Sequence, residues 1–376
     1  MTKAGSSLVR ACRSTPASTN ATDEPAGRTG AHPTSAPLSR PGRPRHSRTV
    51  QRTPVDPELI PIVETLPEFS FVDLASTRAV LDELAASLEP DLNGIVIERH
   101  SVPGLAGEPD VEIQVVRPRE ARPRRAALVT FHSGGFAVGS AELDLAFNVE
   151  LARRLDAVVV AVDYRLAPEH PFPAAVNDGY GALVWLAGGG GGLDVDTARV
   201  AVVCESAGGG LAASVALMAR EQGGPPIRML CLLEPELDDR LGTPSMNQAH
   251  ANVTWKRDQA VLSWEYYLRG GSGEPSPIAA PARQTDLSGL PEAYVTVNQL
   301  DCLRDEGLDF ARLLLASGGL VELHCWPGTV HGFRVLAPGS AVARRAVELL
   351  ISALDRALNE PASAPADRES EEQAHA

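Results

Sequence analysis

A strand is expected to turn sharply into a helix at Val203-Cys204-Glu205-Ser206-Ala207-Gly208-Gly209-Gly210. The apolar run 200–203 is typical of the end of a buried strand, and residues 211–217 have helix-forming composition. A serine between small residues at such a corner is typical of a nucleophile elbow, whose turn lifts the hydroxyl above the sheet edge. Cys204 replaces the first glycine of the usual G-x-S-x-G pattern but is still small. The pattern predicts an α/β fold with Ser206 as candidate nucleophile.

A glycine-containing segment upstream complements this corner. Residues 126–131 form another apolar run, and His132-Ser133-Gly134-Gly135-Phe136 follows it directly. Taken alone, the segment is compatible with an ordinary glycine turn at the end of a strand. Beside the elbow it resembles the HGGG loop of lipases and esterases, with Ser133 in place of the first glycine. The resemblance implies an oxyanion hole made by the backbone N–H groups of Gly134, Gly135 and Ala207, because glycine leaves room for a substrate oxygen.

Two further candidates follow Ser206 in the chain order Ser, Asp, His that α/β-hydrolases use. Asp301 comes just after the predicted strand 293–297, and His331 lies in a glycine-bounded turn after the predicted strand 321–326. Taken singly, an Asp after a strand is usually a helix cap, and a His in a turn is usually solvated. Asp305 is a rival for the acid, but its place at the start of the next helix favours a capping role.

The foldable chain as a whole resembles the hormone-sensitive-lipase-like group of α/β-hydrolase carboxylesterases. The resemblance covers about residues 55–355 and rests on three motifs. They are Asp163-Tyr164-Arg165-Leu166-Ala167-Pro168-Glu169-His170-Pro171-Phe172-Pro173-Ala174-Ala175 and the segments around Asp301 and His331. It implies an α/β-hydrolase fold with a mostly parallel central sheet, helices on both faces and a small helical cap.

The same resemblance implies a mechanism. Ser206 is expected to be the nucleophile, His331 the base and Asp301 the orienting acid, with no metal or organic cofactor. The expected reaction is hydrolysis of short- to medium-chain carboxylic esters through an acyl-enzyme. An amide or N-acyl hydrolase uses the same triad, so that alternative stays open. A non-catalytic small-ligand receptor on this fold is disfavoured, because such receptors have lost the histidine that His331 supplies here.

Composition favours one large domain that acts on small neutral molecules. The 376 residues are 44% hydrophobic, enough for one extensive core, and the formal net charge is −14. An acidic body disfavours nucleic acid as a partner and suits a small-molecule ester. The sequence has no apolar window that suits membrane insertion and no signal-peptide pattern at its start, so we expect a cytoplasmic protein. A homodimer is compatible with the sequence, which does not determine the oligomeric state.

The five cysteines are odd in number and lack the spacing of metal ligands. We expect them to be small buried residues in a reducing compartment. They are Cys12, Cys204, Cys231, Cys302 and Cys325. With Ser133, Cys204 and Cys302 are the departures from the family pattern, and none of the three removes a reacting group.

The two ends of the chain differ from its body. Residues 1–52, rich in Ser, Pro and Arg, and the acidic residues 359–376 are predicted to be disordered tails. Residues 53–358 are predicted to form the α/β-hydrolase domain, with a cap from about 56–92 and 236–270. A helical pattern in the first cap segment places several apolar residues on one side. They are Leu74, Val80, Leu81, Leu84 and Leu88.

Overall fold

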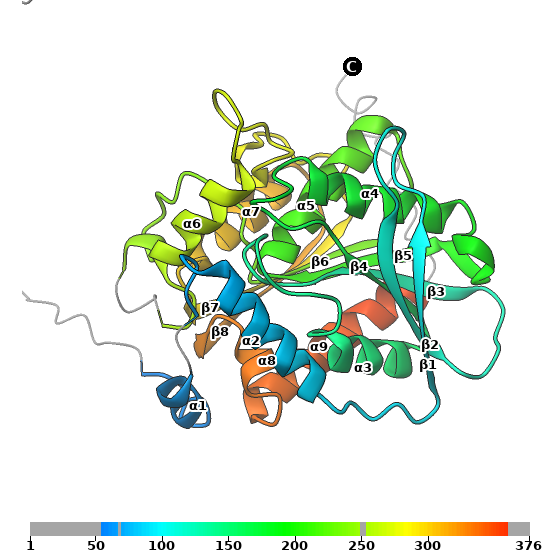
Figure 1. Ribbon diagram of the computed structural model, residues 1–376, viewed down its shortest axis with the longest axis horizontal. Helices are drawn as coiled ribbons and strands as arrows, with labels where there is room; N and C mark the ends of the chain where they lie inside the picture. Colours follow the sequence, from blue (N-terminus) through cyan, green and yellow to red (C-terminus); the bar gives the residue numbers. More distant parts are fainter. Residues whose placement is uncertain (1–53, 67–68, 249–252, 360–376) are drawn as a thin grey trace, which may run out of the picture. The chain divides into compact units, whose positions relative to one another are not determined.

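An eight-stranded sheet forms the centre of the fold (Figure 1). The computed structural model describes residues 54–66, 69–248 and 253–359. The strands are β1 Ile95–Val102, β2 Val111–Pro118, β3 Arg125–Phe131, β4 Val158–Asp163, β5 Val195–Glu205, β6 Met229–Leu233, β7 Glu292–Leu300 and β8 Val321–Val330. Their spatial order is β1-β2-β4-β3-β5-β6-β7-β8. The β1–β2 and β2–β4 pairs are antiparallel and the others are parallel, which confirms the predicted mostly parallel sheet.

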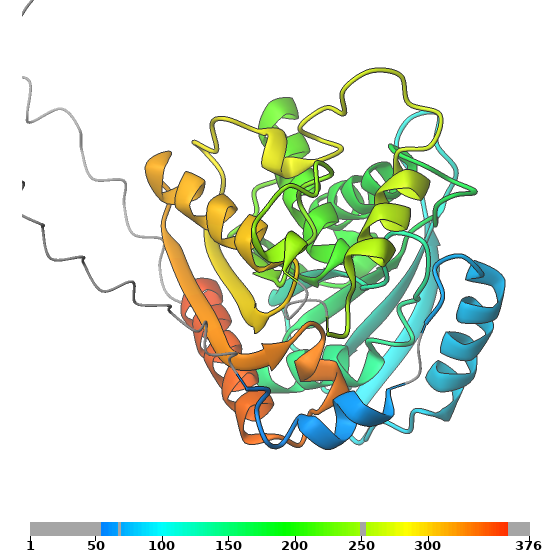
Figure 2. The same ribbon diagram turned by 90° about the vertical axis from the view of Figure 1, so that its left-hand side faces the viewer.

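Helices cover both faces of this sheet (Figures 1 and 2). One face carries α3 Leu145–Leu155 and α9 Ala341–Asn359, and the other carries α4 Ala174–Ala187, α5 Ala207–Gln222 and α7 Arg304–Ala316. Leu128 and Val129 are neighbours in β3 but belong to two separate hydrophobic clusters, because successive strand residues point to opposite faces. Both faces are therefore buried, which explains why the strands read as continuous apolar runs.

Two segments far apart in the sequence meet beyond the strand ends. The first contains α1 Ile60–Thr65 and α2 Leu74–Ser87, and the second contains α6 Arg257–Tyr267. The Tyr266 hydroxyl donates to the Phe71 carbonyl oxygen at 2.8 Å, which joins the two segments. These are the regions predicted to form a cap, and the division of the chain into cap, domain and tails stays a prediction.

The predicted apolar side of α2 is wrong in part. Leu74 and Leu81 pack against the core, but Val80, Leu84 and Leu88 are exposed to 47%, 46% and 38%. The face that turns inward instead includes Arg78, which is one helical turn from both Leu74 and Leu81. Its guanidinium pairs with Glu169 and donates to two backbone carbonyl oxygens, at Ala137 and Ala167. A charged side chain thus joins Leu74 and Leu81 on the inward face of α2.

Several sequence predictions fall at the ends of the chain. The predicted tails lie outside the described residues, apart from Asn359, which ends α9. Among the described residues, none of the helices has the length and apolar character needed to cross a bilayer. Cys204, Cys231 and Cys302 are buried free thiols as predicted, whereas Cys325, on the edge strand β8, is exposed, so the prediction is wrong for this residue.

Candidate active site

Ser206 occupies the corner between β5 and α5 with a backbone conformation that L-residues seldom adopt, φ 58° and ψ −126°. The glycines behind it permit an unusually close crossing of backbones. A Cβ atom at Gly208 would lie 2.1 Å from the Phe131 carbonyl oxygen, and one at Gly210 would lie 2.2 Å from the Glu236 carbonyl oxygen. A larger residue at either position would force the backbone to move. Backbone packing therefore fixes the corner and places Ser206 on the wall of a pocket.

His331 joins the other two predicted site residues. Its Nε2 atom is 2.9 Å from Ser206 Oγ, and its Nδ1 atom is 2.8 Å from Asp301 Oδ2. Asp301 is only 1% exposed, and its second oxygen accepts from the Leu303 backbone N–H at 3.0 Å. A buried carboxylate on Nδ1 favours the tautomer with the proton on Nδ1, which leaves Nε2 free to accept the serine proton. Three residues from the ends of β5, β7 and β8 thus form one continuous hydrogen-bonded line.

Asp305 points elsewhere. Its carboxylate accepts from the Ser245 backbone N–H at 2.7 Å and pairs with Arg304 at 2.8 Å. Burial opposes the ionised form, but the Arg304 and Ser245 contacts outweigh it and lower the pKa of Asp305. This carboxylate lies in the first turn of α7, where the helix dipole favours a negative charge, and holds the loop before α6 to that turn. The N-cap of α7 is Leu303, without a side-chain cap hydrogen bond, so the predicted capping role is wrong. The geometry favours Asp301 over Asp305 as the partner of His331.

The predicted oxyanion loop lies beside Ser206 on the same pocket. Gly134 and Gly135 have φ values of 124° and 54°, in the left-handed region that favours glycine. A Cβ atom at Gly134 would lie 2.1 Å from the Val138 carbonyl oxygen, so any other residue at position 134 would clash with the backbone of this turn. Within the described residues, no hydrogen-bond acceptor is assigned to the N–H groups of Gly134, Gly135 or Ala207. Such free donors beside a candidate nucleophile are what an oxyanion hole requires.

The Asp163–Ala175 motif supports this loop from below. The Tyr164 hydroxyl donates to the His132 carbonyl oxygen at 2.9 Å, and the two rings stack with centroids 4.0 Å apart. Arg165 pairs with Asp178 and Glu108. These contacts hold loops together, so the role of Tyr164 and Arg165 in this motif is structural.

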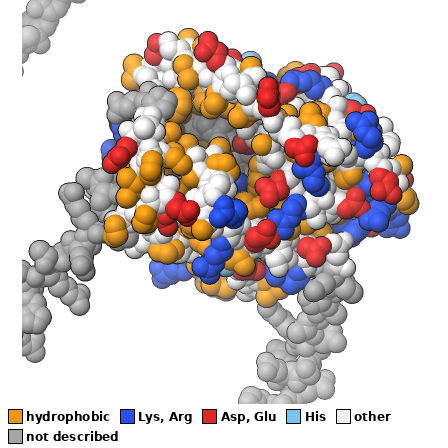
Figure 3. All heavy atoms as spheres, turned by 90° about the horizontal axis from the view of Figure 1, so that it is seen from below, with side chains coloured by type: hydrophobic (Ala, Val, Ile, Leu, Met, Phe, Trp, Pro, Cys, Tyr) orange, Lys and Arg blue, Asp and Glu red, His pale blue; other side chains and the backbone are white. Residues whose placement is uncertain are grey.

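A cavity of about 640 Å³ opens onto Ser206 and His331. Its walls come from both predicted cap segments. The rings of Phe71 and Trp255 make an edge-to-face contact there, with their centroids 5.0 Å apart. Apolar side chains such as Leu81 and Val335 make up much of the lining. A hollow edged by hydrophobic side chains is visible on the face drawn in Figure 3. This volume lies within the usual range for small-molecule sites, and its lining suits an apolar ligand.

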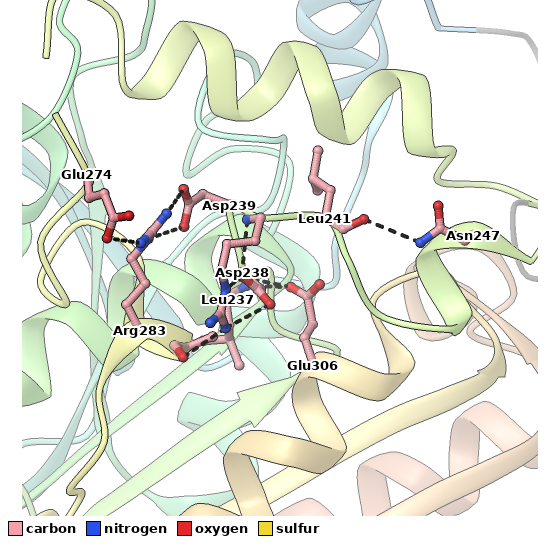
Figure 4. A network of polar contacts seen from close by, with 10 residues as sticks. Leu237, Asp238, Asp239, Leu241, Asn247, Glu274, Arg283 and Glu306 are labelled. Atoms are coloured by element: carbon pink, nitrogen blue, oxygen red, sulfur yellow. Dashed lines mark hydrogen bonds and ion pairs between the residues drawn. The ribbon is translucent and has the colours of Figure 1, made fainter. Parts of the chain in front are cut away.

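Sequence reasoning missed a group of buried carboxyl groups around the site: Glu234, Glu236 and Glu306. Glu306 accepts from the backbone N–H groups of Leu237 and Asp238, as Figure 4 shows. Burial raises the pKa of all three, that of Glu236 to about 8, which favours the neutral acid over the carboxylate. The one signal in the sequence was the pair of acids at 234 and 236 directly after a buried strand.

A second missed contact links the elbow to the histidine turn. Glu205, next to the candidate nucleophile, forms a buried ion pair with Arg334, three residues after His331. Burial lowers the pKa of Arg334 to about 10, which leaves the guanidinium charged at pH 7. The pair joins the two segments that carry Ser206 and His331.

The carboxyl and imidazole groups of Glu234, Asp301 and His331 offer donor atoms within 4.8 Å of one another, which is compact enough to consider a metal. Nδ1 of His331 and a carboxylate oxygen of Asp301 are already bonded to each other at 2.8 Å. An ion would have to replace that hydrogen bond. The residues therefore fit a proton-transfer site better than a metal site.

This fold and this geometry define a class of protein. Residues 128–335 match the family model for the alpha/beta hydrolase fold. Carboxylesterase NlhH of Mycobacterium tuberculosis is 36% identical over 322 residues, covering 83% of this chain and 98% of its own. Esterase LipI of the same organism is 33% identical over 289 residues, covering 75% and 89%.

Solved structures agree with these relatives. A bacterial heroin esterase superposes with a TM-score of 0.77 at 42% identity, covering 81% of this chain and 98% of its own. Esterase LipW from Mycobacterium marinum superposes with a TM-score of 0.74 at 37% identity, covering 81% and 96%. The chain belongs to the hormone-sensitive-lipase-like carboxylesterases of the α/β-hydrolase family, as the motifs predicted. It is a carboxylic ester hydrolase, and the receptor alternative is thereby excluded.

Cys204, the departure at the elbow, is expected to serve packing and not chemistry. It is 3% exposed, burial raises its pKa well above the usual range, and its sulfur accepts from the Phe131 backbone N–H. We expect Cys204→Gly to keep kcat per active site within about threefold, since no reacting group is lost. The free energy of unfolding should fall by about 1–3 kcal/mol, because a buried N–H loses its acceptor.

Thermal melts and kinetics of Cys204→Gly and Cys204→Ser in reducing buffer test this expectation. The serine variant keeps a small acceptor for the Phe131 N–H and should melt above the glycine variant. A large loss of kcat in both reduced variants would show that the thiol takes part in the reaction.

Proposed function

We propose that the chain is a serine carboxylesterase in which Ser206, His331 and Asp301 form the catalytic triad. The observation that carries the proposal is the position of the His331 ring, with Nε2 2.9 Å from Ser206 Oγ and Nδ1 2.8 Å from Asp301 Oδ2. A general base must lie within hydrogen-bond reach of the proton that it removes, and this one does. Asp301 orients the ring and stabilises the imidazolium that forms.

The reaction then follows in two halves. Ser206 Oγ attacks the ester carbonyl carbon while Nε2 of His331 takes the hydroxyl proton. The N–H groups of Gly134, Gly135 and Ala207 bind the oxyanion of the tetrahedral intermediate. Its collapse breaks the bond to the alcohol, which leaves with the proton from His331, and Ser206 remains as an acyl ester. Water, deprotonated by His331, attacks this ester, and the bond between the acyl carbon and Ser206 Oγ then breaks. His331 returns the proton to Ser206 Oγ as the acid is released.

Labelling with a fluorophosphonate tests the proposed nucleophile directly. The reagent forms a stable phosphonyl ester with an activated serine, and peptide mapping by mass spectrometry locates it. We expect one label per chain, on Ser206, because its hydroxyl lies 2.9 Å from Nε2 of His331 and lines the pocket. A label on another residue, or none on an enzyme that hydrolyses esters, would contradict the proposal.

The proposed substrates are esters of short- to medium-chain acids, roughly two to eight carbons. Support comes from the bounded apolar cavity, which Phe71 and Trp255 narrow close to Gly135. We expect kcat/KM on p-nitrophenyl esters to rise with chain length while added methylenes are buried, at about 0.8 kcal/mol each. It should then fall once the chain exceeds the cavity, beyond about eight carbons, because further methylenes stay in water.

A panel of p-nitrophenyl esters from acetate to palmitate, each assayed below its solubility limit, measures this profile. Trp255→Ala is the informative variant, because it removes one wall of the cavity and should shift the optimum to longer chains. Faster turnover of long-chain triglyceride emulsions than of soluble butyrate esters would contradict the proposed substrate class.

A further inference from the structure

The turn after β6, residues 233–236, is bonded directly to the nucleophile. The Ser206 N–H donates to the Leu233 carbonyl oxygen at 2.9 Å, and the Glu236 N–H donates to the Ser206 carbonyl oxygen at 3.0 Å. The β6 turn also packs closely against the start of α5, since a Cβ atom at Gly209 would lie 2.9 Å from the Pro235 side chain. The β6 turn and the backbone of Ser206 therefore move as one unit.

The side chain of Glu234 reaches from this turn to the histidine. Its Oε1 atom accepts from the Gly332 backbone N–H at 2.9 Å. That N–H belongs to the peptide group between His331 and Gly332. The carbonyl oxygen of the same peptide group accepts from the Thr254 hydroxyl at 2.7 Å. One peptide plane, attached to the proposed base, is thus held from both sides.

The carboxyl group of Glu234 is buried, with 3% of the residue exposed. Burial raises the pKa of Glu234 well above its usual range, and the nearby Asp301 carboxylate raises it further. The raised pKa favours the neutral acid, the form that adds no second negative charge beside Asp301 and His331. Its contribution is an acceptor of fixed position, a role that a neutral amide of the same shape can also fill.

We propose that Glu234 is a positioning residue that ties the His331–Gly332 peptide to the Ser206 corner and so keeps Nε2 within reach of Oγ. This inference rests on the proposed function, because it assigns Glu234 a task for that same triad. A base displaced by about 1 Å can lose on the order of 10²-fold in rate, so a link of this kind has kinetic consequences even though Glu234 touches no substrate.

Two substitutions at Glu234 separate the acceptor from mere space filling. Glu234→Gln keeps a carbonyl oxygen for the Gly332 N–H, whereas Glu234→Met keeps the length without a good acceptor. We expect the Gln variant to stay within about threefold of wild type in kcat and in the phosphonylation rate of Ser206. The Met variant should lose about 10- to 100-fold in both, with KM changed by less than about threefold.

A matched control is Glu306→Met. Glu306 is also a buried carboxyl group that accepts from backbone N–H groups, but its partners are Leu237 and Asp238 and not the histidine turn. The Glu306→Met substitution should lower the melting temperature, while the phosphonylation rate of Ser206 stays within about threefold of wild type. All rates are referred to active sites counted by complete labelling, so partial unfolding does not mimic a slower base.

The inference is overturned if Glu234→Met retains wild-type rates, if Glu234→Gln loses as much as Glu234→Met, or if Glu306→Met is slowed equally. Should Glu234→Met not fold, Thr254→Val releases the other side of the same peptide, and an unchanged kcat there overturns the inference. Failure of the proposed function has a different signature, because wild-type enzyme would then not be labelled on Ser206.

Discussion

Ser206→Ala is expected to lower ester turnover by about 10⁶-fold, the scale on which serine hydrolases depend on their nucleophile. The serine hydroxyl is the only atom removed, and its hydrogen bond in the structure is to Nε2 of His331. Alanine has the same Cβ atom as serine, so the backbone at φ 58° is no more strained than before. The variant should therefore fold normally and bind ester without forming the acyl-enzyme.

Stopped assays with p-nitrophenyl butyrate, together with a thermal melt, measure this effect. Ser214→Ala is the matched control, because Ser214 lies on α5, the helix that begins after Ser206, and its hydroxyl donates to the Gly210 carbonyl oxygen. That control should keep turnover within about twofold. Ser206→Ala activity within tenfold of wild type in a preparation free of host esterases would refute the assignment.

Asp301→Asn is expected to lower turnover by about 10⁴-fold, with the fold unchanged. An asparagine that donates its amide N–H to Nδ1 favours the tautomer with the proton on Nε2. The ring then cannot accept the proton of Ser206. The imidazolium formed in the transition state also loses its buried counter-charge, since Asp301 is only 1% exposed.

Asp305→Asn is the comparison that decides between the two acids. Its carboxylate contacts Ser245 and Arg304, so removal of its charge should lower the melting temperature and leave kcat within about threefold. The pKa of Asp305 is depressed in the folded protein, so this contribution to stability is present above the unfolded pKa and is lost on acidification. A kcat loss in Asp305→Asn larger than that in Asp301→Asn would reverse the assignment.

The three residues of the Ser206–His331–Asp301 line were named from sequence, and local chemistry explains why. Ser206, Asp301 and His331 each lie within a few residues of the end of a predicted strand, at a corner, a strand end or a glycine-bounded turn. Parallel strands end at the same edge of a sheet, so residues just beyond those ends converge without knowledge of the loops. The glycines at 134, 135 and 208 could be read in the same way, because only glycine tolerates those backbone angles or contacts.

Contacts between distant segments escaped the sequence because they depend on which surfaces meet. Arg78 was not among the residues predicted to face inward from α2, yet its guanidinium pairs with Glu169 and donates to two backbone carbonyl oxygens. Glutamate is usually exposed, and only the packed structure shows that backbone N–H groups compensate the burial of Glu234 and Glu306.

The order and type of the elements and the positions of the reacting groups were thus determined by sequence alone, since turn chemistry and strand ends are local properties. The support behind those groups was decided by tertiary structure. Burial of a carboxyl group costs free energy unless hydrogen-bond donors compensate it. Here those donors come from other segments of the chain, so they are in place only after the chain has folded.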